Sequence, residues 1–78
     1  MADFAIRIPR VSVTVSEAEL TELLVGTGER VEEGQPLFSI ATEKVEQEVE
    51  AGASGTVHWT GDVGTTYDIG AEIGLITP

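Results

Sequence analysis

The chain contains a single lysine, Lys44, within the segment Ala41-Thr42-Glu43-Lys44-Val45. The segments on either side of it have the composition and alternation of β-strands, so we expect this lysine at the tip of a hairpin. A lone side-chain amine in such a position is suited to covalent attachment of a group. The alternative is an ordinary surface lysine, since a type I turn accepts most residue types.

Other residues that could take part in catalysis or binding form weaker patterns. His58 and Trp59 are the only residues of their types, but no nucleophile or acid–base partner stands near His58 in the sequence, which argues against a catalytic role. Three acids alternate along the segment after the lysine (Glu46, Glu48 and Glu50). Alternating strand residues spread along one face rather than converge, so we expect a solvated face there and no metal site. No glycine-rich phosphate loop is present.

Composition narrows the function further. The chain has 78 residues, no cysteine and a formal net charge of −10. We expect one small domain over residues 1–78, with a thin core and no deep catalytic cleft. The acidity argues against binding nucleic acid or anionic membranes and favours partners with basic surfaces. No apolar run approaches the ~20 residues that span a membrane. We predict a cytoplasmic protein, or one in an equivalent reducing compartment such as a mitochondrial matrix.

Short apolar segments between evenly spread glycines predict an all-β sandwich or barrel. A helix within Ser16–Val25 is the weaker alternative to a strand there. The expected strands are Phe4–Ile8, Val11–Val15, Glu19–Val25, Pro36–Thr42, Val45–Ala51, Gly55–Trp59 and Glu72–Ile76. In the segment after Lys44, Val45, Val49 and Ala51 share the face opposite the three acids, which predicts a half-buried strand.

An internal repeat relates residues 28–40 to residues 64–76 at an offset of 36. Glycines coincide at 28/64 and 34/70, and apolar residues coincide at 31/67, 37/73 and 40/76. One copy is too small to bury a core, so the two copies should pack as a two-fold-related pair of sheets. The first copy runs into the Lys44 turn and the second into the end of the chain. Lys44 and the termini should therefore lie at opposite ends of the fold.

These motifs together resemble a known family. The resemblance rests on Ile8-Pro9-Arg10-Val11-Ser12, on residues 28–37, on Ala41-Thr42-Glu43-Lys44-Val45-Glu46-Gln47-Glu48-Val49 and on Ala53-Ser54-Gly55-Thr56-Val57. The chain is similar over almost its whole length to lipoyl domains of the acyltransferase (E2) components of 2-oxo acid dehydrogenase complexes. Their commonest form around the lysine is Asp-Lys-Ala, whereas this chain has Glu43 and Val45 as neighbours. It also has Ala18 and Leu23 where the family often has Gly and Trp.

The resemblance implies a flattened barrel of two four-stranded antiparallel sheets, with lipoic acid joined by an amide to Lys44. It implies a swinging-arm carrier that is not an enzyme by itself, modified by a lipoyl ligase or transferase that recognises Glu43 and Val45. The implied partners are a thiamine-dependent 2-oxo acid decarboxylase, an acyltransferase core and dihydrolipoamide dehydrogenase. We expect a monomeric domain, excised from the N-terminal part of a longer acyltransferase.

Two alternatives remain open from the sequence. Biotinyl domains have the same fold but carry methionines on both sides of their lysine, and here the only methionine is Met1. An unmodified lipoyl-like interaction module is the other possibility.

Overall fold

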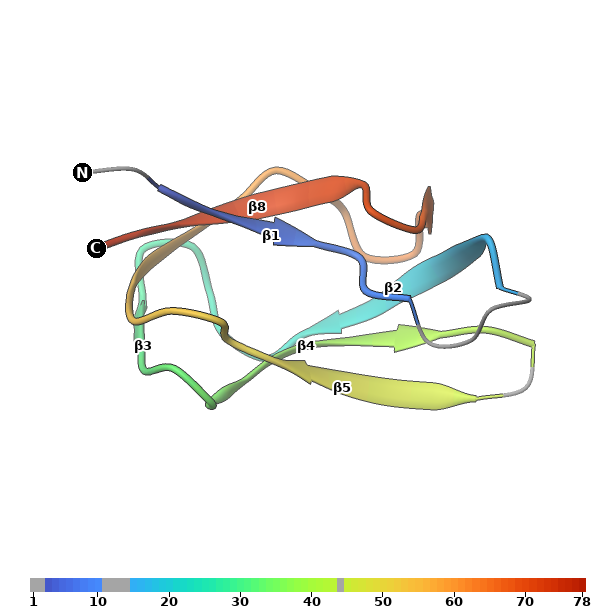
Figure 1. The fold of residues 1–78 in the computed structure, drawn as a ribbon, viewed down its shortest axis with the longest axis horizontal. Coiled ribbons are helices and arrows are strands. Elements are labelled where there is room, and N and C mark those ends of the chain that lie inside the picture. Colours follow the sequence, from blue (N-terminus) through green and yellow to red (C-terminus); the bar gives the residue numbers. More distant parts are fainter. Residues whose placement is uncertain (1–2, 11–14, 44) are drawn as a thin grey trace.

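The computed structural model describes residues 3–10, 15–43 and 45–78, and all regular elements within these ranges are β-strands. The eight strands are β1 (Phe4–Arg7), β2 (Glu17–Leu23), β3 (Arg30–Val31), β4 (Pro36–Ala41), β5 (Glu46–Glu50), β6 (Gly55–Trp59), β7 (Thr66–Asp68) and β8 (Glu72–Thr77). They form two antiparallel four-stranded sheets, ordered β1-β8-β6-β3 and β5-β4-β2-β7. The two sheets lie as separate layers with the core between them (Figure 1). The expected all-β fold of two four-stranded sheets is confirmed.

The internal repeat is confirmed as a structural one. Strands β4 and β8 are six residues long, lie 36 positions apart, and have the same sequence of buried and exposed residues. Gly34 and Gly70 have φ angles of 90° and 89°, and their N–H groups donate to the carbonyls of Ala51 and Ile8 at 2.9 and 2.8 Å. The same offset relates β3 to β7, and the two sheets have matching strand orders. The fold therefore has pseudo-two-fold symmetry.

The two repeats are interlocked by an exchange of strands. β3 belongs to the first repeat but pairs with β6, and β7 belongs to the second repeat but pairs with β2. These short strands were missed by the sequence analysis, because two or three residues beside a turn glycine show no measurable alternation. Each sheet consequently takes its two central strands from one half of the chain and its two edge strands from the other half.

Other differences from the predicted strands are local. β2 begins two residues earlier and ends two residues earlier than expected, and the other matched strands differ by at most one residue at either end. Residues 11–14 of the predicted strand Val11–Val15 lie outside the described residues, and Val15 belongs to no strand. The predicted half-buried strand after Lys44 is buried only at its far end: Ala51 is buried, Val49 is intermediate, and Val45 is 48% exposed. Burial along this segment therefore increases from Val45 to Ala51, on a strand at the edge of its sheet.

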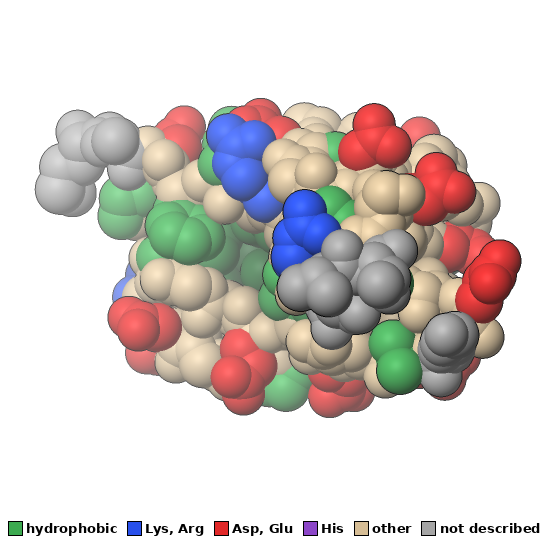
Figure 2. All heavy atoms as spheres, turned by 45° about the vertical axis from the view of Figure 1, so that its right-hand side comes forward, with side chains coloured by type: hydrophobic (Ala, Val, Ile, Leu, Met, Phe, Trp, Pro, Cys, Tyr) green, Lys and Arg blue, Asp and Glu red, His purple; other side chains and the backbone are tan. Residues whose placement is uncertain are grey.

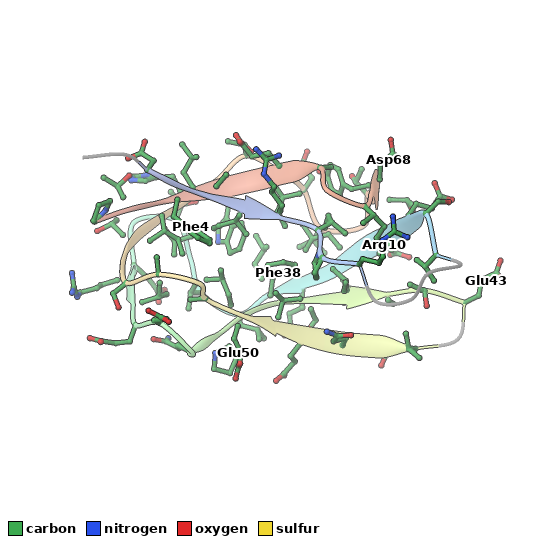
Figure 3. All side chains as sticks on the ribbon, viewed as in Figure 1. Phe4, Arg10, Phe38, Glu43, Glu50 and Asp68 are labelled. Carbon is green, nitrogen blue, oxygen red and sulfur yellow. The ribbon has the colours of Figure 1, made fainter. Side chains whose placement is uncertain are left out.

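The core is entirely apolar among the described residues. It comprises Ile6, Ile8, Ala18, Leu20, Val25, Val31, Leu37, Phe38, Ile40, Ala51, Val57, Ile73 and Ile76. Phe38, which points into the space between the sheets in Figure 3, has its ring centroid 5.9 Å from that of Trp59 in an edge-to-face arrangement. Trp59 also donates its indole N–H to the carbonyl of Val25 at 2.8 Å. The central strands β4 and β8 are thereby fixed by packing from both sheets.

Candidate functional site

The hairpin of β4 and β5 carries the predicted attachment site. β4 is a central strand, paired with β2 on one side and β5 on the other, and its residues Leu37, Phe38 and Ile40 are buried. Ile40 is the last of these; Ala41 and Thr42 are half-buried and Glu43 is exposed. The chain thus leaves the core gradually, and a firmly packed strand supports the hairpin tip.

The tip is a short loop. The last cross-strand pair is Ala41 with Glu46, and beyond it the Thr42 N–H donates to the Val45 carbonyl at 2.8 Å. The Thr42 hydroxyl accepts a hydrogen bond from the Val45 N–H at 3.3 Å and lies 3.5 Å from the Val45 carbonyl oxygen. Only two positions of the sequence, 43 and 44, lie between these bonded residues.

The predicted site residues fall on this tip. Glu43 and Val45 are both exposed, and the side chain of Glu43 points away from the body of the fold (Figure 3). Lys44 lies outside the described residues. Its role as the attachment residue, and the roles of Glu43 and Val45 in recognition, therefore stay predictions. Sequence analysis did not single out Thr42, although a Ser or Thr beside a turn is a known sign of side-chain bonding to the backbone.

The tip lies at the end of the molecule opposite the termini. The molecule is elongated, with extents of 34 × 20 × 20 Å. The two termini are at one end of the long direction, and Glu43 is at the other (Figures 1 and 3). This arrangement agrees with the sequence-based expectation for the neighbours of Lys44. A group attached at the tip would be held away from the point at which the chain enters and leaves the fold.

The strands of the tip-bearing sheet carry seven exposed carboxylates and no basic residue. They are Glu17, Glu19, Glu22, Glu46, Glu48, Glu50 and Asp68, and we refer to them as the acidic face. The strands of the other sheet carry Arg7 and Arg30 and a single acid, Glu72. Figure 2 shows acidic side chains gathered along the lower edge and the right-hand end of the molecule. The predicted solvated acid face is confirmed for Glu46, Glu48 and Glu50.

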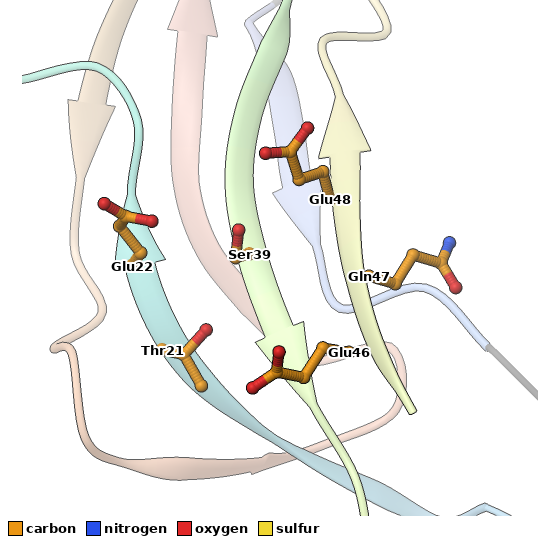
Figure 4. Close-up of a pocket in the computed structure, with 6 residues that line it drawn as sticks. All are labelled: Thr21, Glu22, Ser39, Glu46, Gln47 and Glu48. Carbon is orange, nitrogen blue, oxygen red and sulfur yellow. The ribbon is translucent and has the colours of Figure 1, made fainter. Parts of the chain in front are cut away.

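A shallow hollow lies on this face. Its lining residues are Thr21, Glu22, Ser39, Glu46, Gln47 and Glu48. Figure 4 shows Glu46 and Glu48 directed across β4, whereas Gln47 points the opposite way. The lining contains three carboxylates and no aromatic ring, unlike the mainly apolar and aromatic lining of a pocket that buries a cofactor. Among the described residues no group of His, Cys, Asp or Glu side chains is arranged to hold a metal ion.

The pair His58-Trp59 lies on β6. His58 is exposed on the outer surface of its sheet, whereas Trp59 is half-buried and packs against the core. The Trp59 backbone N–H donates to the Thr27 hydroxyl at 3.1 Å, which adds to the bond from its indole. Trp59 is therefore a structural residue that joins β6 to the loop after β2. His58 lies outside the core.

Comparison with known proteins defines the class of this fold. A family model for biotin and lipoyl attachment domains, described as "Biotin-requiring enzyme", matches residues 5–76. The chain is 33% identical over 72 residues to the dihydrolipoyllysine-residue acetyltransferase component of the pyruvate dehydrogenase complex of Corynebacterium glutamicum. That alignment covers 91% of this chain and 11% of the relative. It is 33% identical over 73 residues to the dihydrolipoyllysine-residue succinyltransferase component of the 2-oxoglutarate dehydrogenase complex of Bacillus subtilis, covering 92% of this chain and 18% of that relative.

The chain belongs to the biotin/lipoyl attachment family. It spans between a tenth and a fifth of the length of these curated relatives, both of which are lipoyl-bearing acyltransferase components. The family match and these relatives support a covalently attached group, either lipoyl or biotinyl. None of the described residues lies in a helix long and apolar enough to cross a membrane.

Proposed function

We propose that this chain is the lipoyl carrier domain of an acyltransferase (E2) in a 2-oxo acid dehydrogenase complex, with lipoate joined by an amide to Lys44. The observation that carries the proposal is the position of the chain's one lysine in the sequence between Thr42 and Val45, which close an exposed two-residue loop. Similarity to two lipoyl-bearing acyltransferase components supports lipoate as the attached group. The neighbours Glu43 and Val45, in place of methionines, favour lipoate over biotin.

The site fits a group that works while extended from the protein. Glu43 and Val45 are exposed and the hairpin projects from a packed strand, so a modifying enzyme can approach the tip without displacing core residues. When bound, lipoate supplies a dithiolane that takes up acyl groups and electrons. The protein holds the hairpin in one register, with Glu43 and Val45 exposed at its tip. A carrier of this kind needs no cleft, which agrees with the open, shallow hollow found on the acidic face.

In this proposal the lipoyl group on Lys44 reacts in turn with three enzymes. They are a thiamine-dependent 2-oxo acid decarboxylase, the acyltransferase core and dihydrolipoamide dehydrogenase. Because the domain is tethered within the complex, each of these encounters is effectively intramolecular. None of the three enzymes therefore has to bind the domain tightly. The formal net charge of −10, concentrated on the strands of one sheet, favours rapid encounter with basic surfaces on these enzymes. A lipoyl ligase or transferase is the further partner that installs the group.

Mass spectrometry of the intact protein tests the proposal. The purified chain is incubated with a lipoyl ligase, ATP and lipoate, and in parallel with a biotin ligase, ATP and biotin. We expect one lipoyl increment in the first reaction and none in the second, with peptide mapping placing it on Lys44. Lys44→Arg keeps the positive charge but removes the acylatable amine, and it should remain unlabelled. A biotinyl increment alone would establish the biotin carrier instead, and no increment in either reaction would support an unmodified interaction module.

A further inference from the structure

The loop that carries the attachment position has no residue that would fix its conformation by backbone preference. Positions 42–45 are Thr, Glu, Lys and Val, without the Gly, Asn, Asp or Pro that usually determine a tight turn. By contrast, Gly34 and Gly70 supply positive φ angles at the tight turns before β4 and β8. Some other interaction must therefore hold the two sides of the tip together.

The two sides of the tip are unequally anchored. Thr42 is half-buried and follows directly on the packed strand β4, whereas Val45 is 48% exposed and precedes the edge strand β5. Core packing therefore fixes Thr42 but contributes little to Val45. Hydrogen bonds must supply what packing does not on the Val45 side.

The Thr42 hydroxyl makes this connection. It accepts a hydrogen bond from the Val45 N–H at 3.3 Å and lies 3.5 Å from the Val45 carbonyl oxygen, while the Thr42 N–H donates to that same carbonyl at 2.8 Å. Both backbone groups of Val45 are thereby bonded to one residue. Side-chain bonds of this kind take the place of a turn-specifying residue, because they fix the backbone locally without a positive φ angle.

We propose that Thr42 is the positioning residue of the attachment site, and that its hydroxyl holds the two-residue loop in the conformation that the lipoyl-attaching enzyme recognises. The inference rests on the proposed function. A loop ordered in advance presents the amine in one geometry, so the enzyme does not have to order it during binding. Loss of the hydroxyl leaves the amine in place but spreads it over several geometries.

The test compares three variants of the full chain. Thr42→Val keeps the shape of the side chain and its preference for extended backbone, but it lacks the hydroxyl. Thr42→Ser keeps the hydroxyl, and Thr42→Ala is a second variant without one. Thr56→Val is the matched control, because Thr56 is also a half-buried strand residue but lies on β6 in the other sheet, where it pairs with Thr77 near the C-terminus. Each is assayed with a lipoyl ligase, ATP and lipoate for kcat and KM, using intact mass as the readout.

We expect kcat/KM to fall about three- to ten-fold for Thr42→Val and Thr42→Ala, the range that corresponds to the net contribution of one neutral hydrogen bond. Thr42→Ser should restore it to within about two-fold of wild type, and Thr56→Val should leave it unchanged. Hydrogen exchange gives a readout independent of the enzyme. The Val45 amide should exchange faster in the two variants without a hydroxyl than in wild type and Thr42→Ser.

Several results would overturn the inference. Equal kcat/KM for wild type, Thr42→Val and Thr42→Ala would show that the hydroxyl does not position the amine. A loss in Thr42→Ser as large as in Thr42→Val would assign the effect to side-chain size instead. An unmodified wild-type chain would overturn the proposed function together with this inference, whereas a labelled wild type with unaffected variants would overturn this inference alone.

Discussion

Replacement of the two repeat-related glycines tests whether backbone conformation, rather than space, requires glycine at these turns. Gly34 and Gly70 have φ angles of 90° and 89°, and a Cβ added at either would meet no atom within 4 Å. Alanine there causes no clash, so its effect is that of an L residue in a left-handed conformation. Such strain is about 1–3 kcal/mol, and the lower entropy of the unfolded alanine chain adds about 0.4–1 kcal/mol of further stability to offset it. The net loss in unfolding free energy is about 1–2 kcal/mol.

Denaturation in urea and by heat, followed by the fluorescence of the single tryptophan, measures this loss. For a domain of this size, 1 kcal/mol corresponds to a fall in Tm of about 4–8 °C. Gly34→Ala and Gly70→Ala should be equally destabilised, and Gly34→Asn should be less so, because Asn enters left-handed conformations more readily. Gly26→Ala is the control: Gly26 has no positive φ, and its Cβ would meet only the flexible side chain of Glu29. An unchanged Tm for Gly34→Ala, or a loss in Gly34→Asn as large as in alanine, would refute the argument from strain.

Three further predictions concern the sheets and the core. Glu17 and Asp68 are exposed cross-strand partners of like charge, so Glu17→Arg should raise the unfolding free energy by about 0.5–1 kcal/mol in a urea titration; a gain that did not shrink with added salt would contradict this origin. Trp59→Phe removes the indole N–H that donates to the Val25 carbonyl at 2.8 Å, and thermal denaturation followed by circular dichroism should show a loss of about 1–2 kcal/mol. Phe38→Ala empties a fully buried position and should cost about 3–5 kcal/mol in the same assay, with a smaller loss indicating that the core collapses to fill the space.

Much of the fold could be predicted from the sequence because its repeating features are local. Turn glycines, alternation and the 36-residue offset identified the pseudo-symmetric halves, and β6 was predicted with its observed bounds, Gly55–Trp59. The pairing of the strands could not be predicted in the same way. The strand exchange through β3 and β7 depends on contacts between residues far apart in the chain, and strands of two or three residues carry too little pattern to be recognised.

The candidate site, too, could be predicted only in part from the sequence. A lone lysine between two strand-like segments is visible in the sequence, and so are its neighbours Glu43 and Val45. The hydrogen bonds of Thr42 depend on the register of β4 against β5, which pairs Ala41 with Glu46. A shift of one residue would move Thr42 to the other face of the hairpin, so its role becomes visible only once the register is known.

The exchange of strands between the two repeats has a consequence for how the chain folds. Phe4 pairs with Ile76 in one sheet and Glu17 pairs with Asp68 in the other, so each sheet needs a pairing between residues far apart in the sequence before it is complete. Contacts this distant in sequence delay folding relative to local hairpins of similar stability. A chain cut between the two repeats would leave each fragment with an unfinished sheet and an exposed edge. During synthesis, the β4–β5 hairpin therefore emerges before β7, the strand that completes its own sheet.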